Sequence, residues 1–264
     1  MEEIFVNFDY AEIFGFDISK WQDDPTTPQK NNFQKMKDYG ASFVISKAGQ
    51  YNFQDISFSD NWKRSKENGL SRGSYWFCDS RSDGKSQAQK YWEILLKNGY
   101  DGEICFADYE GGAWNTWKEL YNFIYEFQRI SNMPSHKIGI YTGYYFWLEN
   151  MPKTDSERNF FKKFPLWLAY YTEDVSFVKV PKPWSEEELI LWQSGTPAIG
   201  REAGVESREI DYNKFQGNSE RFFNYFGKPE ISEPEIPEIP IPEKELRSLI
   251  INYGNKKISY EERL

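Results

Sequence analysis

The chain has 264 residues, a length that suits one large domain or two small ones. Its formal net charge of −9 argues against nucleic-acid binding, because contacts to phosphate depend on clustered Lys and Arg. There is one histidine, His136, and there are two cysteines, Cys78 and Cys105. These counts argue against hydrolases with a His base beside Ser or Cys, and against zinc sites built from several His or Cys ligands. We therefore expect no metal and no cofactor.

Residues 1–12 form an N-terminal extension before the first predicted strand. They lack the basic stretch followed by an apolar stretch that marks a secretory signal, and no apolar run in the chain is long enough to span a membrane. We expect a protein that is made in the cytoplasm without a signal peptide and that leaves the cell by another route.

Short apolar runs follow in chain order, and helical patterns separate the earlier ones. This alternation is typical of parallel sheets built from βαβ units. Helical spacing predicts helices after the third and fourth runs, whereas the connection after the sixth shows no sustained helical period. The predicted strands are residues 13–19, 42–48, 71–77, 103–110, 137–142, 165–171, 189–194 and 208–212.

This order predicts an α/β fold, namely an irregular eight-stranded (β/α) barrel of the TIM type over residues 13–227, with helices missing between the last strands. A doubly wound open sheet is the alternative. It is disfavoured because no glycine-rich phosphate loop follows the first strand, where dinucleotide-binding proteins place one.

The composition changes after Gly227. Residues 228–243 interleave Pro with Glu, which favours extended polyproline II structure, so this segment is predicted to be a linker. Residues 244–264 are predicted to form one short amphipathic helix, because apolar side chains recur there with helical spacing, at Leu246, Leu249, Ile250 and Tyr253. Two interpretations stay open for this segment: a frayed tail, or a docking element for a protein partner.

Two carboxylates stand two positions apart in the stretch CFADYEGG, residues 105–112. Residues i and i+2 of a strand face the same side, so Asp108 and Glu110 should look into one space. They end the fourth predicted strand, and the active sites of parallel barrels are built at that end of the strands. The position suits catalysis.

Asp17 ends the first predicted strand, and Asp211 lies in the last one. In a closed barrel these strands are neighbours, so the two carboxylates should meet at the rim. Four converging carboxylates without a histidine are typical of glycoside hydrolysis, in which one acid with a raised pKa protonates the leaving oxygen. Which of the four holds the proton stays open, because coupled acids titrate as a set.

Aromatic residues make up 19% of the chain, more than a core of this size needs for packing. Flat aromatic faces suit sugar rings. Each such residue taken alone is more often a packing residue. Together, the aromatics at or just beyond predicted strand ends predict a platform for a glycan, and they are Trp21, Tyr75, Trp114, Tyr141, Tyr170 and Trp192.

In order and spacing, these motifs resemble those of the family 25 glycoside hydrolases, the lysozymes common in bacteriophage endolysins. The resemblance covers residues 13–216 and rests on GFDISKWQ, FVISKAGQ, RGSYWF, CFADYEGG, IGIYTGYYFW, PLWLAYY, LILWQSG and EIDYNKF. It implies an irregular barrel that hydrolyses the β-1,4 bond between N-acetylmuramic acid and N-acetylglucosamine in bacterial peptidoglycan, for cell-wall lysis by a phage.

Carried over motif by motif, the resemblance makes Glu110 the proton donor and Asp17 and Asp211 further acids of the site. For Asp108 it implies either electrostatic support or a part in a substrate-assisted mechanism. The sequence departs from the family at the second strand, where KAGQ lacks an acid. It also departs at Trp76, which stands where members often carry a histidine, so we expect this residue to offer a larger flat face to the sugar and to make different contacts there.

Two other functions are weighed against this one. A chitinase-like glycosidase of the substrate-assisted kind would require an acid where this chain has Phe106. A catalytically inactive wall-binding or virion structural protein could use the same barrel, but the retention of all four acids argues against it. Wall-cleaving amidases and peptidases are the least compatible with a single histidine.

Overall fold

A computed structural model describes residues 13–23, 27, 30–111 and 116–228, together with the backbone of residues 249–253 and 256–260. The chain divides into two units, Met1–Glu230 and Ile231–Leu264. The division lies close to the predicted end of the barrel at residue 227. The predicted N-terminal extension and nearly all of the predicted linker lie outside the described residues.

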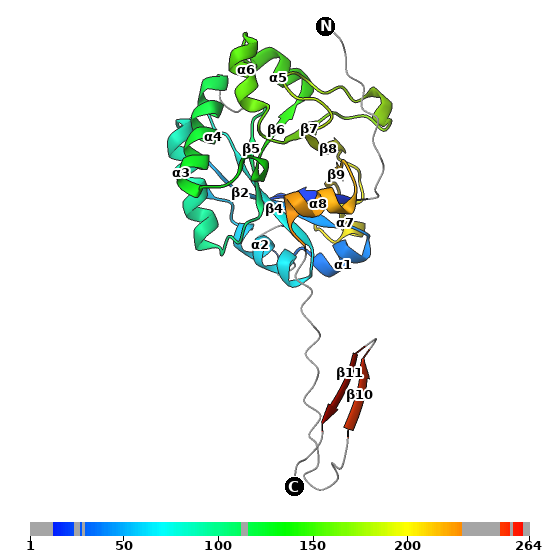
Figure 1. The fold of residues 1–264 in the computed structure, drawn as a ribbon. Helices are drawn as coiled ribbons and strands as arrows, with labels where there is room; N and C mark the ends of the chain where they lie inside the picture. Colours follow the sequence, from blue (N-terminus) through cyan, green and yellow to red (C-terminus); the bar gives the residue numbers. More distant parts are fainter. Residues whose placement is uncertain are drawn as a thin grey trace. The chain divides into compact units, whose positions relative to one another are not determined.

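Eight strands form a closed barrel in the first unit (Figure 1). A parallel pairing of the first strand with the second closes the ring. A short strand, β3 (Phe53–Gln54), forms a hairpin on β2 outside this ring. The predicted fold class is therefore confirmed. In spatial order the barrel strands are β1 (Phe14–Ile18), β9 (Asp211–Phe215), β8 (Leu189–Gly195), β7 (Leu166–Ala169), β6 (Ile138–Gly143), β5 (Ile104–Asp108), β4 (Ser71–Phe77) and β2 (Phe43–Gln50).

Helices join the earlier strands and become sparse toward the end of the barrel, as expected. Only the 3-10 turn η2 (Val175–Phe177) lies between β7 and β8, and only the four-residue helix α7 (Gly200–Ala203) lies between β8 and β9. No helix among the described residues has the length and apolar character needed to cross a bilayer. The remaining helices are α1 (Phe33–Asp38), α2 (Phe58–Glu67), α3 (Gly84–Lys97), α4 (Trp117–Ser131), η1 (Ser135–Lys137), α5 (Tyr144–Asn150), α6 (Asp155–Phe161) and α8 (Ser219–Phe226).

The two longest helices, α3 and α4, follow the third and fourth predicted strands, where helical spacing predicted them. Asp83 caps α3 by accepting a hydrogen bond from the Ser86 amide (3.0 Å). The buried ring of Tyr91 on α3 stacks on Phe127 of α4, with ring centroids 4.9 Å apart. The apolar faces of the helices therefore pack on each other as well as on the sheet.

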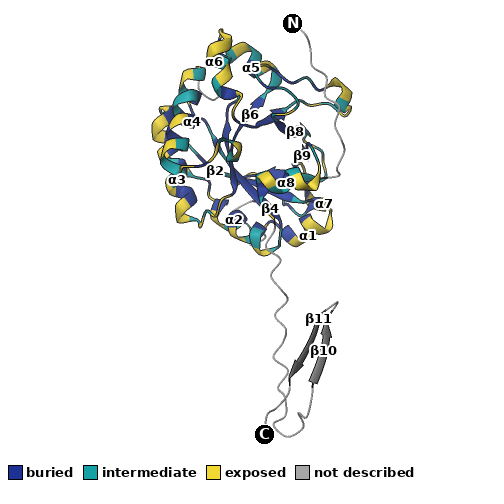
Figure 2. Cartoon of the chain, viewed as in Figure 1, coloured by how far each residue is buried: buried dark blue, intermediate teal, exposed yellow. Residues whose placement is uncertain are grey.

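The barrel strands are largely buried (Figure 2). Their side chains alternate between a core inside the barrel and a core between the sheet and the helices. In β5, Ile104 and Phe106 belong to the inner cluster, whereas Cys105 and Ala107 belong to the outer one. Asp108 continues the inward phase of β5. This alternation decides which side chains at the rim can reach the barrel interior.

Helix α8 closes the end of the barrel at which the parallel strands begin. Phe222 and Phe226 belong to the inner cluster, and Phe226 lies 4.8 Å from Phe43, measured between ring centroids. The interior is therefore filled from this end by aromatic side chains. A polar site inside the barrel can therefore lie only at the opposite rim, where the parallel strands end.

β9 runs antiparallel to both of its neighbours, β1 and β8, which was not predicted. The connection from β8 turns back on itself, because the Gly200 amide donates to Arg208 O (2.9 Å) and the Ile210 amide donates to Pro197 O (3.3 Å). The chain thus re-enters the sheet at the rim that it left. β9 begins at Asp211 rather than at the predicted residue 208.

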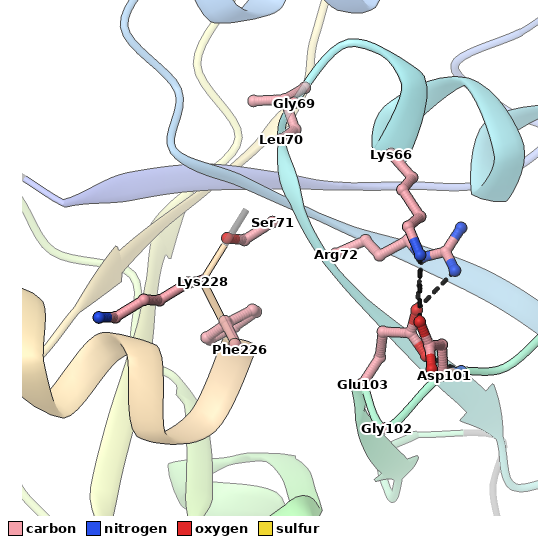
Figure 3. Close-up of a pocket in the computed structure, with 11 residues that line it drawn as sticks. Lys66, Gly69, Leu70, Ser71, Arg72, Asp101, Gly102, Glu103, Phe226 and Lys228 are labelled. Carbon is pink, nitrogen blue, oxygen red and sulfur yellow. Dashed lines mark hydrogen bonds and ion pairs between the residues drawn. The ribbon is translucent and has the colours of Figure 1, made fainter. Parts of the chain in front are cut away.

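A cavity of about 180 Å³ lies beside the starts of β4 and β5, at the end of the barrel closed by α8 (Figure 3). Its lining includes the acids Asp101 and Glu103. Asp101 pairs with Lys66 (3.1 Å) and Glu103 pairs with Arg72 (2.5 Å). Because both acids are engaged in ion pairs, this cavity is a poor candidate for acid catalysis.

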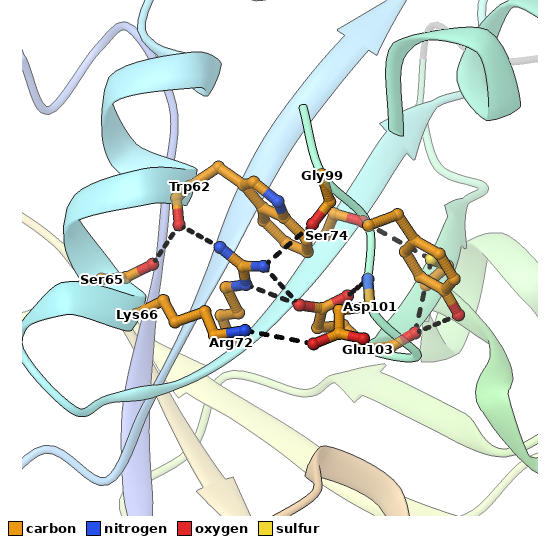
Figure 4. A network of polar contacts seen from close by, with 10 residues as sticks. Trp62, Ser65, Lys66, Arg72, Ser74, Gly99, Asp101 and Glu103 are labelled. Atoms are coloured by element: carbon orange, nitrogen blue, oxygen red, sulfur yellow. Dashed lines mark hydrogen bonds and ion pairs between the residues drawn. The ribbon is translucent and has the colours of Figure 1, made fainter. Parts of the chain in front are cut away.

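The Arg72–Glu103 pair is buried and satisfied from several sides (Figure 4). Arg72 Nε and Nη2 donate to Glu103 Oε1 (2.7 and 2.5 Å), and Arg72 Nη1 donates to Trp62 O (2.6 Å). The guanidinium carbon also lies 4.0 Å from the centroid of the Trp62 ring. The Asp101 amide donates to Glu103 Oε2 (2.6 Å). The pair therefore joins α2, β4 and the start of β5.

Glu103→Ala should lower the free energy of unfolding by about 3–5 kcal/mol, because it leaves the Arg72 guanidinium buried without its counter-charge. Urea unfolding followed by circular dichroism measures this change. The matched control is Asp101→Ala, which breaks the exposed pair with Lys66 and should cost less than about 1 kcal/mol. Equal losses in the two variants would contradict a structural role for the buried pair.

The C-terminal unit contains two antiparallel strands, β10 (Leu249–Tyr253) and β11 (Lys256–Tyr260), where a helix was predicted. The helix prediction was wrong because so short an apolar set satisfies both the helical and the strand period. The segment is rich in β-branched Ile, and Gly-Asn at positions 254 and 255 is a typical two-residue hairpin connection. A docking role for this segment stays a prediction.

Candidate active site

Four carboxylates gather at the rim where the parallel strands end. Asp108 ends β5, and Glu110 follows two residues later. Asp17 pairs directly with Asp211 across β1 and β9. Because β9 is antiparallel, its first residue lies at this rim and not at the opposite one. Asp17 and Asp211 are therefore neighbours, as expected, and Glu110 interacts electrostatically with both.

Asp17 is held by a network of amide and hydroxyl groups. Its Oδ1 accepts hydrogen bonds from Gln193 Nε2 (2.9 Å) and from Asn213 Nδ2 (2.8 Å). Trp167 Nε1 donates to Asn213 Oδ1 (2.8 Å), and the Tyr141 hydroxyl donates to Gln193 Oε1 (2.9 Å). The orientation of Asp17 is thus fixed by β6, β7, β8 and β9 together.

Burial dominates the electrostatics of Asp17 and Asp108. Burial raises the pKa of Asp17 well above its ordinary value, and the charge of Asp211 raises that pKa further, while the bonds from Asn213 and Gln193 oppose the rise. Burial also raises the pKa of Asp108 well above its ordinary value, with Glu110 adding to the rise. Asp108 Oδ1 is buried and has no hydrogen-bond partner in the described structure. Asp108 is therefore a destabilised carboxylate.

Glu110 is only partly buried, unlike Asp108. Burial raises the pKa of Glu110, the charge of Asp211 raises it further, and Lys47 and a hydrogen bond from Tyr141 oppose the rise. A carboxyl group with a raised pKa at a partly open rim keeps its proton to a higher pH than an ordinary Glu and can still reach a substrate. Glu110 thus fits the position of a general acid.

Lys47 is a cation of the site that was not predicted. It lies on β2, opposite Tyr75 of β4, and its Nζ donates to Gln50 Oε1 (2.7 Å). Burial lowers the pKa of Lys47, and the charges of Asp108, Asp55 and Glu110 oppose this. In turn, Lys47 lowers the pKa of Asp108. Lys47 therefore favours the ionised form of the buried carboxylate.

Because Asp108 is buried, we expect it to lower the stability of the protein by an amount that depends on pH. The pKa of Asp108 is raised on folding, so the folded state binds more protons and stability falls as pH rises through the folded pKa. At pH 7 the free energy of unfolding of Asp108→Asn should therefore exceed that of the wild type by about 1 kcal/mol.

That gain should shrink as pH falls toward the unfolded Asp pKa of about 3.9, where both proteins carry an uncharged group. Urea unfolding at pH 7 and pH 4 tests this. Asp38→Asn, at an exposed position on α1, is the matched control and should change little. A destabilised Asp108→Asn protein at pH 7 would contradict the prediction.

Two of the predicted aromatic residues face the acids. Tyr75 lies on the inner face of β4, and its ring contacts Trp167 edge-on at 6.1 Å between centroids. Burial raises the pKa of Tyr75 well above its ordinary value, and the charges of Asp17 and Asp108 add to the rise. Tyr141 lies on the inner face of β6, and its hydroxyl reaches Gln193 and Glu110. Both residues are positioned to contact a sugar beside the acids.

Trp76 and Trp192 face outward, so they are not part of the groove. Both are fully buried among the helices. Trp76 Nε1 donates to Gln87 Oε1 (3.0 Å), and its ring stacks on Tyr91. Trp192 Nε1 donates to Tyr170 O (2.7 Å). The expectation that Trp76 offers a flat face to the sugar is wrong, because it alternates with the inward-facing Tyr75.

The remaining predicted aromatics differ in their placement. Tyr170 is half-buried and turned toward α5, where its ring lies 6.4 Å from that of Tyr145. Trp21 is 73% exposed just beyond β1, with Lys20 Nζ 4.7 Å from its ring centroid. Trp114 lies outside the described residues. Tyr171, which was not predicted, donates to Gln193 Oε1 (3.1 Å).

Comparison with known proteins identifies the family. Residues 16–195 match the model of the glycosyl hydrolases family 25. The chain belongs to this family. Among its relatives, this family 25 enzyme is 27% identical to lysozyme M1 of Streptomyces globisporus, over 81% of this chain and 71% of that protein.

Solved structures show the same architecture. A bacterial lysozyme from Streptomyces coelicolor aligns with a TM-score of 0.63 at 25% identity, over 83% of this chain and 99% of that one. The catalytic domain of endolysin ply40 from Listeria monocytogenes bacteriophage P40 shares the fold, with a TM-score of 0.62 at 21% identity over 81% and 97% of the two chains. The family 25 enzyme is thus a glycoside hydrolase of the lysozyme, or muramidase, type.

The described residues contain no group of three or more His, Cys, Asp and Glu side chains that could hold a metal ion. The functional groups that sequence reasoning missed are Lys47, Gln193 and Asn213, which lie on inner strand faces, and Tyr171, which lies just beyond β7. A signal for them existed. Lys47 is two positions from the inward Ile45, and Asn213 is two positions from Asp211, so each shares a strand face with a residue of the inner layer.

Proposed function

We propose that this family 25 enzyme hydrolyses the β-1,4 bond between N-acetylmuramic acid and N-acetylglucosamine in bacterial peptidoglycan. One observation supports this above all. Glu110 lies at a partly open rim, where a substrate can reach it, beside the buried Asp108. Burial raises the pKa of both carboxyl groups, and the charge of Lys47 opposes the rise in both. Acid-catalysed glycoside cleavage needs one carboxyl group of such a pair to be protonated and the other to be ionised.

In this mechanism Glu110 donates its proton to the glycosidic oxygen while the bond from that oxygen to C1 of muramic acid breaks. The ionised Asp108 stabilises the positive charge that develops at C1. Water supplies the hydroxyl group at C1, and its other proton restores Glu110. Attack by the substrate acetamide, in place of direct attack by water, leaves these two roles unchanged. Asp17 and Asp211 orient the substrate from the opposite side of the rim.

Digestion of purified peptidoglycan, followed by borohydride reduction and analysis of the reduced ends, tests the proposal. We expect muramitol. Glucosaminitol would show cleavage of the other glycosidic bond, and free amines without new sugar ends would show an amidase or peptidase. Cleavage of chitin oligomers at a comparable rate would favour the chitinase-like alternative. Wall binding without any release would favour the inactive scaffold.

We propose further that the enzyme serves phage-induced lysis and reaches the wall from the cytoplasm through a membrane lesion or on a virion. The likeness of its motifs to those of endolysins supports this setting. Bacteria whose wall the enzyme digests in vitro should stay intact when they produce it internally, and should lyse when chloroform opens their membrane. Lysis of producing cells without any such lesion would overturn the proposed route.

A further inference from the structure

A groove lined by aromatic residues lies near the acids, between the ends of β6 and β7. A groove of about 670 Å³ is formed there by the start of α5 and by the chain that follows β7, elements that lie side by side in Figure 1. Its aromatic lining consists of Tyr144, Tyr145, Phe146, Tyr170, Tyr171 and Phe177. None of the side chains that line this groove is charged. The groove thus contrasts with the acidic centre of the site.

Hydrogen bonds link one wall of the groove to the catalytic centre. The Tyr171 hydroxyl donates to Gln193 Oε1, and the same Gln193 side chain donates to Asp17. On the other wall, α5 begins directly after Gly143, which is two residues beyond the inward-facing Tyr141. A polymer bound across the acids could therefore extend into the groove without leaving the protein surface.

Four of the aromatic side chains of the groove have fixed neighbours, namely Tyr144, Tyr145, Tyr170 and Tyr171, although several rings are open to solvent. Tyr145 and Tyr171 are 69% and 64% exposed, and Phe177 is 60% exposed. The Tyr145 hydroxyl is hydrogen-bonded to Tyr170, and the ring of Tyr170 lies 5.4 Å from that of Tyr144. Exposed apolar surface that is fixed in a concave site marks a binding site and not a packing residue left at the surface.

We propose that this groove binds a neutral N-acetylhexosamine ring of the glycan strand, beyond the two sugars that flank the bond to be cut. A pyranose presents C–H groups on one face, which pack on an aromatic ring, and hydroxyl groups at its edge, which bond to Tyr hydroxyls. Peptide stems carry several carboxylates, whereas the lining itself holds no cation and one lysine, Lys179, acts on it electrostatically through Tyr170. The inference rests on the proposed function, because it assigns the groove to the same substrate.

Binding measured in a Glu110→Gln background tests this without turnover. The ligands are peptide-free chains of two, four and six alternating N-acetylglucosamine and N-acetylmuramic acid units, titrated by calorimetry. Tyr145→Ala should weaken binding of the six-sugar chain by about tenfold and leave binding of the two-sugar unit unchanged. Tyr145→Phe should retain most of the affinity. Tyr125→Ala, which removes a 52% exposed tyrosine on α4 outside the groove, should change neither.

An unchanged six-sugar affinity, or an equal loss for the two-sugar unit, would overturn the assignment. A loss seen only with chains that carry peptide stems would assign the groove to the stem and would also overturn it. The proposed function is tested separately by the wall-digestion experiment. Release of glucosaminitol there would contradict the proposed bond specificity, while calorimetry would still show whether the groove binds sugar.

Discussion

Glu110→Gln should lower kcat on peptidoglycan by about 10³-fold, within the range expected for the loss of a general acid. The amide has nearly the same shape as the carboxyl group but cannot supply the proton, so KM and the unfolding temperature should change little. Release of reducing muramic ends under saturating substrate measures kcat, and circular dichroism checks the fold.

Glu149→Gln provides the matched control, because it makes the same chemical change at an exposed position on α5. It should retain wild-type kcat. A Glu110→Gln enzyme with more than about a tenth of wild-type kcat would remove Glu110 from the role of proton donor. The result would then direct attention to Asp17 or Asp108, whose pKa values are also raised.

Lys47→Met should move the whole pH profile of kcat/KM to higher pH. Lys47 lowers the pKa of Asp108 and of Glu110, so removal of its charge raises both. Activity requires Asp108 to be ionised and Glu110 to be protonated. The acid limb, set by ionisation of Asp108, and the alkaline limb, set by deprotonation of Glu110, therefore shift in the same direction. At the wild-type optimum we expect a loss of about 10²-fold.

Two variants separate the charge of Lys47 from its volume and from a general change in net charge. Lys47→Arg keeps the cation and should keep both limbs near their wild-type positions. Lys63→Met removes an exposed lysine of α2, whose side chain is 74% exposed, and should leave the profile unchanged. If the pH profile of kcat/KM of Lys47→Met has both limbs at their wild-type positions, other groups keep Asp108 ionised.

The strand period predicted the inward positions of Asp108 and Glu110 because a two-residue repeat depends only on local geometry. The same rule, applied to Trp76, would have placed it outside, since its neighbour Tyr75 faces in. Position at a strand end does not by itself turn a side chain toward the barrel interior. The outer core of this barrel is unusually aromatic, so a tryptophan at the rim is as well explained by packing under a helix as by sugar binding.

Other features depend on contacts that are distant in the sequence. The direction of β9 could not be predicted, because an alternating pattern is the same when it is read in reverse. It follows from the loop that bonds Gly200 to Arg208. The inward position of Lys47 could be read from its strand, but not which carboxylates lie near it: Asp108 and Glu110 come from the end of β5, and Asp55 follows β3.

The seam between β1 and β9 has a consequence for biosynthesis. Asp17 and its partner Asn213 are 196 positions apart, near opposite ends of the barrel sequence. A nascent chain that has not yet released β9 from the ribosome lacks Asp211, lacks the bond that orients Asp17, and has an open ring of strands. The four-carboxylate site is therefore complete only once β9, the last strand of the barrel, has been translated and has paired with β1.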